Sequence, residues 1–482
     1  MLILRFVGLS LLIAPSAFCA AACDTLAALH LPDTTITVAR TFDTDCVVDA
    51  TIKPTPDSEI QIEVRLPLSG WNGKYLATGN GGWCGSIGAA GLTKGTRLGY
   101  ATSATDTGHT GCNAQFAPGH PEKVIDYAYR SEHEMAVKSK AIIQAFYGRP
   151  PSLSYWLGCS AGGKQALMEA QRYPEDFDGI VAGSPAANWT GRSSQAIWVA
   201  QAVHQNAASE LPQQKYAVIH AAALAACDTL DGVKDGVIEN PRHCHFDPQT
   251  IACKGDDGPD CLTKPQVETV RRIYSDSVNP RTHERWYAGL EPGSEMTWHI
   301  WGGKNPLTIA SDHFKYVVFE DPKWDFRTLD FDRGIEKAER LDAHRINALN
   351  PDLQPFFAHG GKLIQYHGWN DTQIAPGNSV DYYESVLKKM GGLAKVQPSY
   401  RLFMVPGMNH CSGGDGAYLF DPLTALEQWR EKGVAPERMV ARAAPAHPRT
   451  RPLCPYPAEA VYKGSGSTDD EANFTCAVVA SR

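Results

Sequence analysis

A serine between small residues is the first candidate for chemistry. The segment GCSAG at 158–162 places Ser160 between glycines two positions away on either side. A nucleophile on a sharp strand-to-helix turn needs small residues there, because the strained backbone lies against neighbouring strands. The apolar run LSYWL precedes the serine and ALMEAQRY follows it, as a strand and a helix would. The pattern alone is common and also fits an ordinary turn, but in this context it predicts that Ser160 is a nucleophile.

A nucleophilic serine needs a base to take its proton and an acid to orient that base. When such a serine lies on a strand-to-helix turn of an α/β sheet, the acid and then the histidine follow it in the chain. Asp371 follows the apolar run KLIQY, and His410 follows RLFMV. His109 precedes the serine and His367 is too near Asp371 in sequence, so both are weaker candidates for the base. Asp106 also precedes the serine, and we expect Asp106 and His109 to be structural.

Two backbone amides are candidates for stabilising the negative oxygen that forms during attack at a carbonyl. The N–H of Ala161 would lie at a helix N-terminus, where unpaired donors and the helix dipole favour an anion. The loop GNGG at 79–82 is the natural source of a second donor. We predict Gly82 for that donor, with Gly81 as the alternative, and a simple turn is the other interpretation of this loop.

The elements that would position these residues alternate along the chain. The segment 60–82 reads as two strands ending in a glycine-rich loop, and 152–186 reads as strand, turn, helix, loop and strand. A strand at 361–371, a helical pattern at 382–391 and a strand at 400–411 follow. This order predicts an α/β fold with a mostly parallel sheet and its working residues at the carboxyl ends of the strands.

A long insertion interrupts this pattern. More than 170 residues separate the strand ending near Ala186 from Lys362, far more than a plain connection needs. We therefore predict a catalytic domain built from 23–186 and 362–482, and a separate lid domain at 187–361.

Composition excludes several classes of protein. The chain has 482 residues, 43% of them hydrophobic and 20% charged, which is enough apolar material for a large core. The net charge of -8 argues against a nucleic-acid partner. No stretch reaches the roughly 18 apolar residues of a membrane span. We expect a small-molecule partner, and the sequence leaves the oligomeric state open.

The N-terminus and the cysteines indicate export. Residues 1–22 have the layout of a secretory signal peptide, with a membrane anchor or a lipoprotein as alternatives. Of 13 cysteines, Cys19 lies in this leader, and the remaining twelve could form six disulfides in an oxidising compartment. The mature protein is thus expected to be secreted or periplasmic.

The cysteines next to the proposed catalytic residues support the triad. Cys159 precedes Ser160 and Cys411 follows His410. If the serine and the histidine meet by hydrogen bond, the two cysteines come within the roughly 4.4 to 6.8 Å Cα separation of a disulfide. Proximity in sequence predicts three further bridges, which are Cys227 with Cys244, Cys253 with Cys261, and Cys454 with Cys476.

Six motifs together resemble a known family. They are GNGGW, ATDTGH, GCSAGGKQAL, FDGIVAGSPA, HGWND and PGMNHC. With the cysteines, they are similar to the tannase and feruloyl esterase family of secreted α/β-hydrolases, which includes mono(hydroxyethyl) terephthalate hydrolases. The resemblance covers nearly the whole mature chain and implies the α/β-hydrolase fold. It is specific for the family and not for one substrate within it.

The resemblance also implies a calcium site in the insertion. The loop at 227–238 carries three carboxylates on a glycine-bent backbone, as a hard cation requires. It is similar to an EF-hand loop but lacks the bidentate Glu at the twelfth position, and a solvated acidic turn is the alternative. In the family this loop binds a structural calcium ion. The implied ligands are the side chains of Asp228, Asp231 and Asp235 and the carbonyls of Val233 and Val237.

For the four N-terminal cysteines, the resemblance implies that Cys23 pairs with Cys84 and that Cys46 pairs with Cys112. Four cysteines allow three connectivities, and the sequence alone does not choose among them.

The expected activity is hydrolysis of a carboxylic ester of an aromatic acid, a hydroxycinnamate or a gallate. A terephthalate monoester hydrolase or a general aryl esterase is the alternative within this class, and a peptidase on the same fold is a further one. The alternative from another functional class is a non-catalytic, calcium-stabilised protein that binds carbohydrate or polyphenol. Aromatic residues of the insertion could form a wall for the acyl group, but most are expected to be core residues. They are Trp286, Trp298, Trp301, Trp324 and Phe326.

Overall fold

The computed structural model describes residues 20–445 and 448–479 of the chain. Residues 1–19 of the predicted signal peptide, Cys19 among them, lie outside the described residues. Within the described ranges, none of the helices combines the length and the apolar character needed to cross a bilayer.

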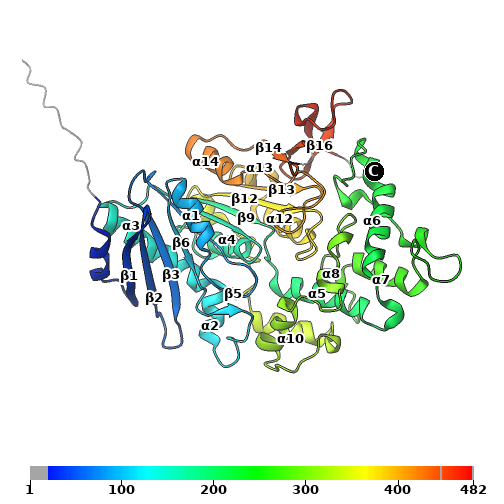
Figure 1. Cartoon of the computed structure of the whole chain (residues 1–482), viewed down its shortest axis with the longest axis horizontal. Helices are drawn as coiled ribbons and strands as arrows, with labels where there is room; N and C mark the ends of the chain where they lie inside the picture. Colours follow the sequence, from blue (N-terminus) through cyan, green and yellow to red (C-terminus); the bar gives the residue numbers. More distant parts are fainter. Residues whose placement is uncertain (1–19, 446–447, 480–482) are drawn as a thin grey trace, which may run out of the picture.

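A nine-stranded sheet in the order β1-β2-β3-β6-β4-β8-β9-β12-β13 forms the centre of the molecule (Figure 1). The strands from β6 to β13 in this order are parallel, whereas β1, β2 and β3 form an antiparallel extension at one edge. The α/β fold is confirmed, and the antiparallel edge adds to the predicted parallel sheet. The strands are β1 Thr34–Phe42, β2 Asp45–Ile52, β3 Ile60–Pro67, β4 Lys74–Thr78, β6 Ala101–Thr105, β8 Leu153–Cys159, β9 Gly179–Gly183, β12 Lys362–Gly368 and β13 Tyr400–Val405.

Both faces of the parallel strands are buried, as their apolar sequences require. On β8, Tyr155 and Trp156 point to opposite faces and are both fully buried. One face packs against helices α3, α4 and α12, and the other packs against α14. The helices outside the insertion are α1 Ala89–Arg97, α2 Pro121–Ile125, α3 Ser131–Tyr147, α4 Ala161–Arg172, α12 Gly377–Met390, α13 Leu393–Val396 and α14 Pro422–Lys432.

The segment between β9 and β12 forms a helical body to one side of the sheet, drawn in green to yellow in Figure 1. It has a hydrophobic cluster of its own, which includes Trp298 and Trp301. The separate lid domain at 187–361 stays a prediction. Its elements are α5 Trp189–Val203, α6 Gln213–Cys227, α7 Lys264–Tyr274, β10 Ser277–Val278, β11 Arg285–Tyr287, α8 His299–Gly302, α9 Ile309–Asp312, α10 Arg333–Asp342 and α11 Gln354–Ala358.

Short antiparallel pairs complete the chain. The pairs β14–β15 and β16–β17 lie after α14, and β5–β7 lies near the glycine-rich loop. These strands are β5 Cys84–Gly85, β7 Gly111–Cys112, β14 Met439–Arg442, β15 Thr450–Leu453, β16 Ala458–Tyr462 and β17 Phe474–Val478.

The disulfides confirm four predicted bridges and correct two. Cys159 pairs with Cys411, and the three bridges predicted from proximity also form. The predicted pairs Cys23 with Cys84 and Cys46 with Cys112 are wrong. Cys84 lies directly opposite Cys112 in the β5–β7 pair and bonds to it. Cys23 lies in a short 3₁₀ helix at Cys23–Ala28, 5.5 Å in Cα separation from its partner Cys46 on β2.

Candidate active site

Ser160 occupies a strained turn between β8 and α4. Its backbone has φ 66° and ψ -121°, a combination that non-glycine residues seldom adopt. The Ser160 N–H donates to the Gly183 carbonyl at 3.0 Å, and the Ser160 carbonyl accepts from Ala186 at 3.1 Å. The predicted need for small neighbours is visible, because a Cβ on Gly158 would collide with the Gly162 carbonyl. This geometry is that of a serine presented at the end of a strand for nucleophilic attack.

His410 and Asp371 meet at the ends of the adjacent parallel strands β13 and β12. The Nδ1 atom of His410 lies 2.7 Å from Oδ2 of Asp371. Since an ionised carboxylate only accepts hydrogen bonds, Nδ1 carries the proton and Nε2 is left as the basic nitrogen. The two residues predicted from the sequence are therefore brought together with the histidine in the tautomer that a general base needs.

Asp371 is buried but well supplied with donors. Its Oδ1 accepts from the backbone N–H groups of Gln373 at 2.8 Å and Ile374 at 3.0 Å. Burial would raise the pKa of this carboxyl, but His410 and His367 outweigh it and hold the pKa of Asp371 well below its ordinary value. Asp371 is therefore a carboxylate throughout the neutral range.

His367 has a supporting position that the sequence analysis missed. Its Nε2 lies 3.2 Å from Oδ2 of Asp371 and 3.0 Å from the Ile374 carbonyl, while Nδ1 lies 2.6 Å from Oγ of Ser379. Two acceptors at Nε2 make it the protonated nitrogen, so the Ser379 hydroxyl donates to Nδ1. The spacing of four residues between His367 and Asp371 is the only hint in the sequence that the two side chains lie close together.

A disulfide ties the serine turn to the histidine loop. Cys159 and Cys411 are bonded with a Cα separation of 6.1 Å, which is within the expected range. It links residues 252 positions apart in the sequence. Because Ser160 and His410 are the immediate neighbours of these cysteines, the bridge limits their relative movement.

The glycine-rich loop lies against the start of α4. The Asn80 carbonyl accepts from Gly162 N–H at 2.8 Å, and Gly79 approaches Gly162 so closely that a Cβ there would be 2.5 Å from its Cα. Gly82 has φ 50° and accepts through its carbonyl from the Tyr127 hydroxyl at 2.7 Å. In the described part of the chain we find no hydrogen bond from the backbone N–H of Ala161 or Gly82. Within the described residues, neither predicted amide is therefore taken up by a protein acceptor, and their role with a ligand stays a prediction.

Asp106 and His109 contact the backbone and a ring of nearby segments, and their structural role stays a prediction. Oδ1 of Asp106 accepts from the N–H groups of Gln61 at 2.9 Å and Gly108 at 2.8 Å. Nε2 of His109 lies 2.7 Å from the Trp83 carbonyl, and its ring stacks on Phe116.

The predicted calcium loop is a compact acidic turn. The carboxylate of Asp228 accepts from the N–H groups of Asp235 at 3.1 Å and Gly236 at 3.2 Å. Asp231 and Asp235 line one cavity together with Val237, and Arg449 lies 3.2 Å from Asp235. Val233 donates its N–H to Asp231 at 2.9 Å.

A different group satisfies a simple distance criterion for metal ligation. Among the described residues, the ligand atoms of Cys253, Asp257 and Cys261 lie within 4.8 Å of one another. Both sulfurs of this group are in one disulfide, so they are not free thiolates.

Two of the five candidate aromatic residues of the insertion are core residues. Trp298 and Trp301 are buried in the helical body, and the other three pack against its cluster while partly exposed. We therefore assign none of the five as a substrate contact.

Comparison with known proteins decides the family. The sequence model described as "Tannase and feruloyl esterase" matches residues 46–477, which is most of the chain. The chain belongs to the tannase and feruloyl esterase family. Like the relatives in this family, it is a carboxylic-ester hydrolase.

Relatives in this family are similar along nearly their whole length. An uncharacterized esterase of Xanthomonas campestris is 37% identical, over 96% of this chain and 92% of the relative. A probable feruloyl esterase B-2 of Neosartorya fischeri is 36% identical, over 93% and 90%.

Solved structures in this family confirm the α/β-hydrolase architecture. Feruloyl esterase B from Aspergillus oryzae superposes with a TM-score of 0.88 at 30% identity, covering 94% of this chain and 99% of that structure. Tannin acyl hydrolase from Aspergillus niger gives 0.79 at 22% identity, covering 95% and 93%, which is evidence for the fold alone.

Proposed function

We propose that this chain is an exported serine esterase that hydrolyses esters of aromatic acids, with Ser160, His410 and Asp371 as its triad. The observation that carries the proposal is the 2.7 Å contact from Nδ1 of His410 to Asp371, next to a disulfide that joins the histidine loop to the serine turn. The similarity to feruloyl esterase B from Aspergillus oryzae favours a hydroxycinnamate or gallate ester as the substrate.

The first half of the reaction acylates the serine. Oγ of Ser160 attacks the ester carbonyl carbon while Nε2 of His410 accepts the hydroxyl proton. Asp371 stabilises the resulting imidazolium. The negative oxygen of the tetrahedral intermediate accepts hydrogen bonds from the N–H groups of Ala161 and Gly82. Collapse of the intermediate breaks the ester C–O bond, and His410 returns its proton to the departing alcohol.

The second half regenerates the enzyme. Water replaces the alcohol, His410 takes one of its protons, and the hydroxide oxygen adds to the acyl carbon. The same amides hold the negative oxygen. The acid leaves when its bond to Oγ breaks, and the proton on His410 returns to Ser160. A metal ion has no part in these steps.

A structural calcium ion at 228–237 is part of the proposal. The residues present fit a hard cation in their chemistry, because the carboxylate-bearing Asp231 and Asp235 line one cavity with Val237, and Asp228 lies on the same loop. The carbonyl of Val233 is the remaining proposed ligand. Arg449 and Arg451, which line the same cavity, both pair with Asp235, so the site has less uncompensated negative charge than its three carboxylates alone would give. When bound, the ion would supply cross-linking of the loop and no chemistry.

Export is proposed from the leader and from the six disulfides, which persist in oxidising compartments. The mature chain would then act outside the cytoplasm, in the periplasm or in the medium.

Side-by-side rates on methyl ferulate, methyl gallate and a terephthalate monoester test the substrate class. These acyl groups differ in length and hydroxylation, so the acyl pocket must discriminate among them. We expect the ferulate or the gallate ester to give the highest kcat/KM. Preference for the terephthalate monoester would favour the alternative within the class, and cleavage of aminoacyl anilides would favour a peptidase. Absence of any turnover with binding retained would favour the non-catalytic alternative.

A further inference from the structure

The loop that carries Asp371 is held from the side of the insertion. The carbonyl of Thr372 accepts from the indole Nε1 of Trp301 at 2.5 Å, and its hydroxyl lies 2.9 Å from the hydroxyl of Thr297. The carbonyl of Gln373 accepts from Nε of Arg192 at 3.3 Å. Residues from α5, α8 and the turn before α8 therefore contact two consecutive residues after the catalytic acid.

Arg192 is unusual among these contacts because it is a buried cation without a carboxylate partner. Only 4% of Arg192 is exposed, and no Asp or Glu oxygen of the described residues lies within ion-pair distance of it. Its guanidinium lies over the rings of Trp301 and Trp189, at 5.1 and 5.5 Å from their centroids. Its Nη1 atom has no hydrogen-bond partner. Burying an unpaired charge costs desolvation free energy, so we looked for a function that this arginine performs at its position.

The charge of Arg192 is retained at neutral pH. Burial lowers the pKa of its guanidinium to about 10, and Tyr287, Tyr127 and Asp371 act in the opposite direction. A full positive charge therefore lies in the same low-dielectric region as the buried carboxylate of the triad, where their attraction is weakly screened.

We propose that Arg192, together with Trp301, is a positioning residue that fixes the acid loop and thereby keeps Asp371 aligned with His410. In this role the insertion helps to position the acid of the triad. The inference rests on the triad of the proposed function.

The hydrogen bonds around Gln373 connect the two sides directly. The N–H of Gln373 donates to Oδ1 of Asp371, and its carbonyl accepts from Arg192. A shift of this residue would change the orientation of the carboxylate, and Oδ2 of the same carboxylate holds Nδ1 of His410. Errors of about 1 Å in such an arrangement can cost on the order of a hundredfold in rate.

An alternative role for Arg192 is direct recognition of a polar group on the acyl part of the substrate. The two roles differ in their dependence on the substrate. A substrate anchor matters only for an acyl group long enough to reach it, whereas a positioning residue matters for every ester. The acetyl group of 4-nitrophenyl acetate is too short to use an acyl anchor, so comparison with methyl ferulate separates the roles.

The experiment measures kcat and KM on both esters for Arg192→Met, Arg192→Lys and Trp301→Phe. Trp301→Phe keeps an aromatic ring beneath Arg192 and removes the indole N–H donor together with part of the ring volume. For Arg192→Met we expect kcat to fall about tenfold to a hundredfold on both esters by similar factors, with KM changed less than about threefold. Arg192→Lys should recover part of the loss, and Trp301→Phe should lower kcat on both esters as well.

Arg272→Met is the matched control. Arg272 is also an arginine of the insertion stacked on a tryptophan, with its guanidinium 4.2 Å from the Trp198 ring centroid. Its Nε likewise lacks a partner, but it makes no hydrogen bond to the acid loop in the described structure. We expect its kcat on both esters to stay within about twofold of that of the unmodified enzyme, because the triad geometry is untouched.

The outcomes separate this inference from the proposed function. A loss confined to methyl ferulate, or a folded Arg192→Met enzyme with unchanged kcat, would overturn the positioning role while leaving the triad intact. If Arg192→Met does not fold, Trp301→Phe decides in the same way. A Ser160→Ala enzyme that remained active would instead refute the triad itself.

Discussion

The carboxylate of Asp371 accepts several hydrogen bonds at the candidate active site. Its two oxygens accept hydrogen bonds from the backbone of Gln373 and Ile374 and from the rings of His367 and His410. A buried carboxylate is tolerated only when its lone pairs are satisfied in this way. Because its pKa lies below the ordinary Asp value, its contribution to stability is present above about pH 4 and is lost only as the pH falls through the folded-state pKa.

Asp371→Asn tests this residue as the acid of the triad. The backbone N–H groups of Gln373 and Ile374 would hold the oxygen of the Asn side chain, so its NH₂ group would face His410. An NH₂ group cannot accept a hydrogen bond, so His410 would lose the partner that holds Nδ1 protonated. We expect kcat for an aryl ester to fall about 10⁴-fold with the melting temperature within a few degrees of that of the unmodified enzyme. A folded variant with less than a tenfold loss would contradict the role of Asp371.

Asp106→Asn tests the structural interpretation of a second buried carboxyl. Burial raises the pKa of Asp106 to about 6, although two backbone N–H groups oppose the shift. A raised carboxyl pKa means that the folded state binds more protons, so Asp106 makes stability fall as pH rises from about 4 to about 6. The Asn side chain keeps the acceptor oxygen and does not titrate.

Urea unfolding at pH 4.5 and pH 7.5 measures this difference. We expect the free energy of unfolding of Asp106→Asn, relative to that of the unmodified enzyme, to rise by about 2 kcal/mol between the two pH values. A relative stability that does not change with pH would show that Asp106 has no raised pKa.

At the scale of elements, the strongly apolar strands were predictable, whereas the buried parallel strand β6 and the edge strand β1 were not. The strands β8, β12 and β13 are continuous apolar runs ended by glycine or polar loops, which is the pattern of a strand covered on both faces. By contrast, β6 has the sequence ATSAT, which is fully buried yet contains no large apolar residue. The exposed edge strand β1 is also largely polar. Neither has a sequence signal that separates it from a loop.

The three triad residues could be predicted because the strands before them could be predicted. Ser160, Asp371 and His410 each follow an apolar strand closely, and parallel strands bring their carboxyl ends together. Arg192 was not predictable, because it belongs to a helix of the insertion and reaches Gln373 only through the tertiary fold. The predicted pairing of the N-terminal cysteines was wrong for a similar reason. The short β5–β7 pair that aligns Cys84 with Cys112 has no sequence signal.

The bridge between Cys159 and Cys411 gives a prediction at this scale. We expect Cys159→Ala combined with Cys411→Gly to lower kcat for an aryl ester at least about tenfold at a temperature where the enzyme stays folded, because the serine and histidine loops are then free to shift. Glycine suits position 411, where φ is 63°. Circular dichroism at the assay temperature establishes that the variant is folded.

The control for this variant removes another bridge. Cys454→Ala combined with Cys476→Ala deletes a disulfide of the C-terminal strands, remote from the triad in sequence. It should lower the melting temperature with kcat nearly unchanged. Full activity of the folded Cys159 and Cys411 variant would show that this bridge acts on stability alone.

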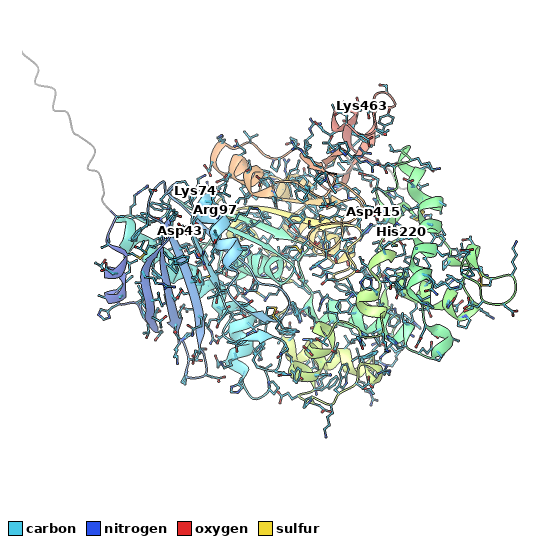
Figure 2. The ribbon with its side chains drawn as sticks, viewed as in Figure 1. Asp43, Lys74, Arg97, His220, Asp415 and Lys463 are labelled. Atoms are coloured by element: carbon cyan, nitrogen blue, oxygen red, sulfur yellow. A yellow bond between two sulfur atoms is a disulfide. The ribbon has the colours of Figure 1, made fainter. Side chains whose placement is uncertain are left out.

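At the scale of the molecule, the insertion contacts the catalytic part at several places besides the acid loop. In Figure 2, His220 of α6 and Asp415 of the loop after His410 lie next to each other, with Nε2 of His220 3.7 Å from Oδ2 of Asp415. Asn240, just past the acidic loop, donates to Glu459 of β16 at 2.6 Å. Asp235 of the acidic loop also pairs with Arg449 and Arg451, so the loop contacts the C-terminal part of the chain.

Removal of calcium tests this connection. An ion bound only by the folded loop stabilises the protein by mass action. We expect a chelator to lower the melting temperature by several degrees, and calcium in excess to restore it, without a change in the pH dependence of kcat. Asp228→Asn should abolish the response to calcium. A melting temperature independent of calcium, or a chelated folded enzyme without activity, would contradict a purely structural ion.

The most direct test of the central claim is the hydrolysis of methyl ferulate by the purified enzyme and by Ser160→Ala, measured side by side. Alanine removes only the hydroxyl, and the turn is held by backbone hydrogen bonds that alanine can also make. We expect a loss of kcat of several orders of magnitude with an unchanged fold, because triad members act as a unit. A folded Ser160→Ala enzyme that keeps more than about a hundredth of the rate would contradict it.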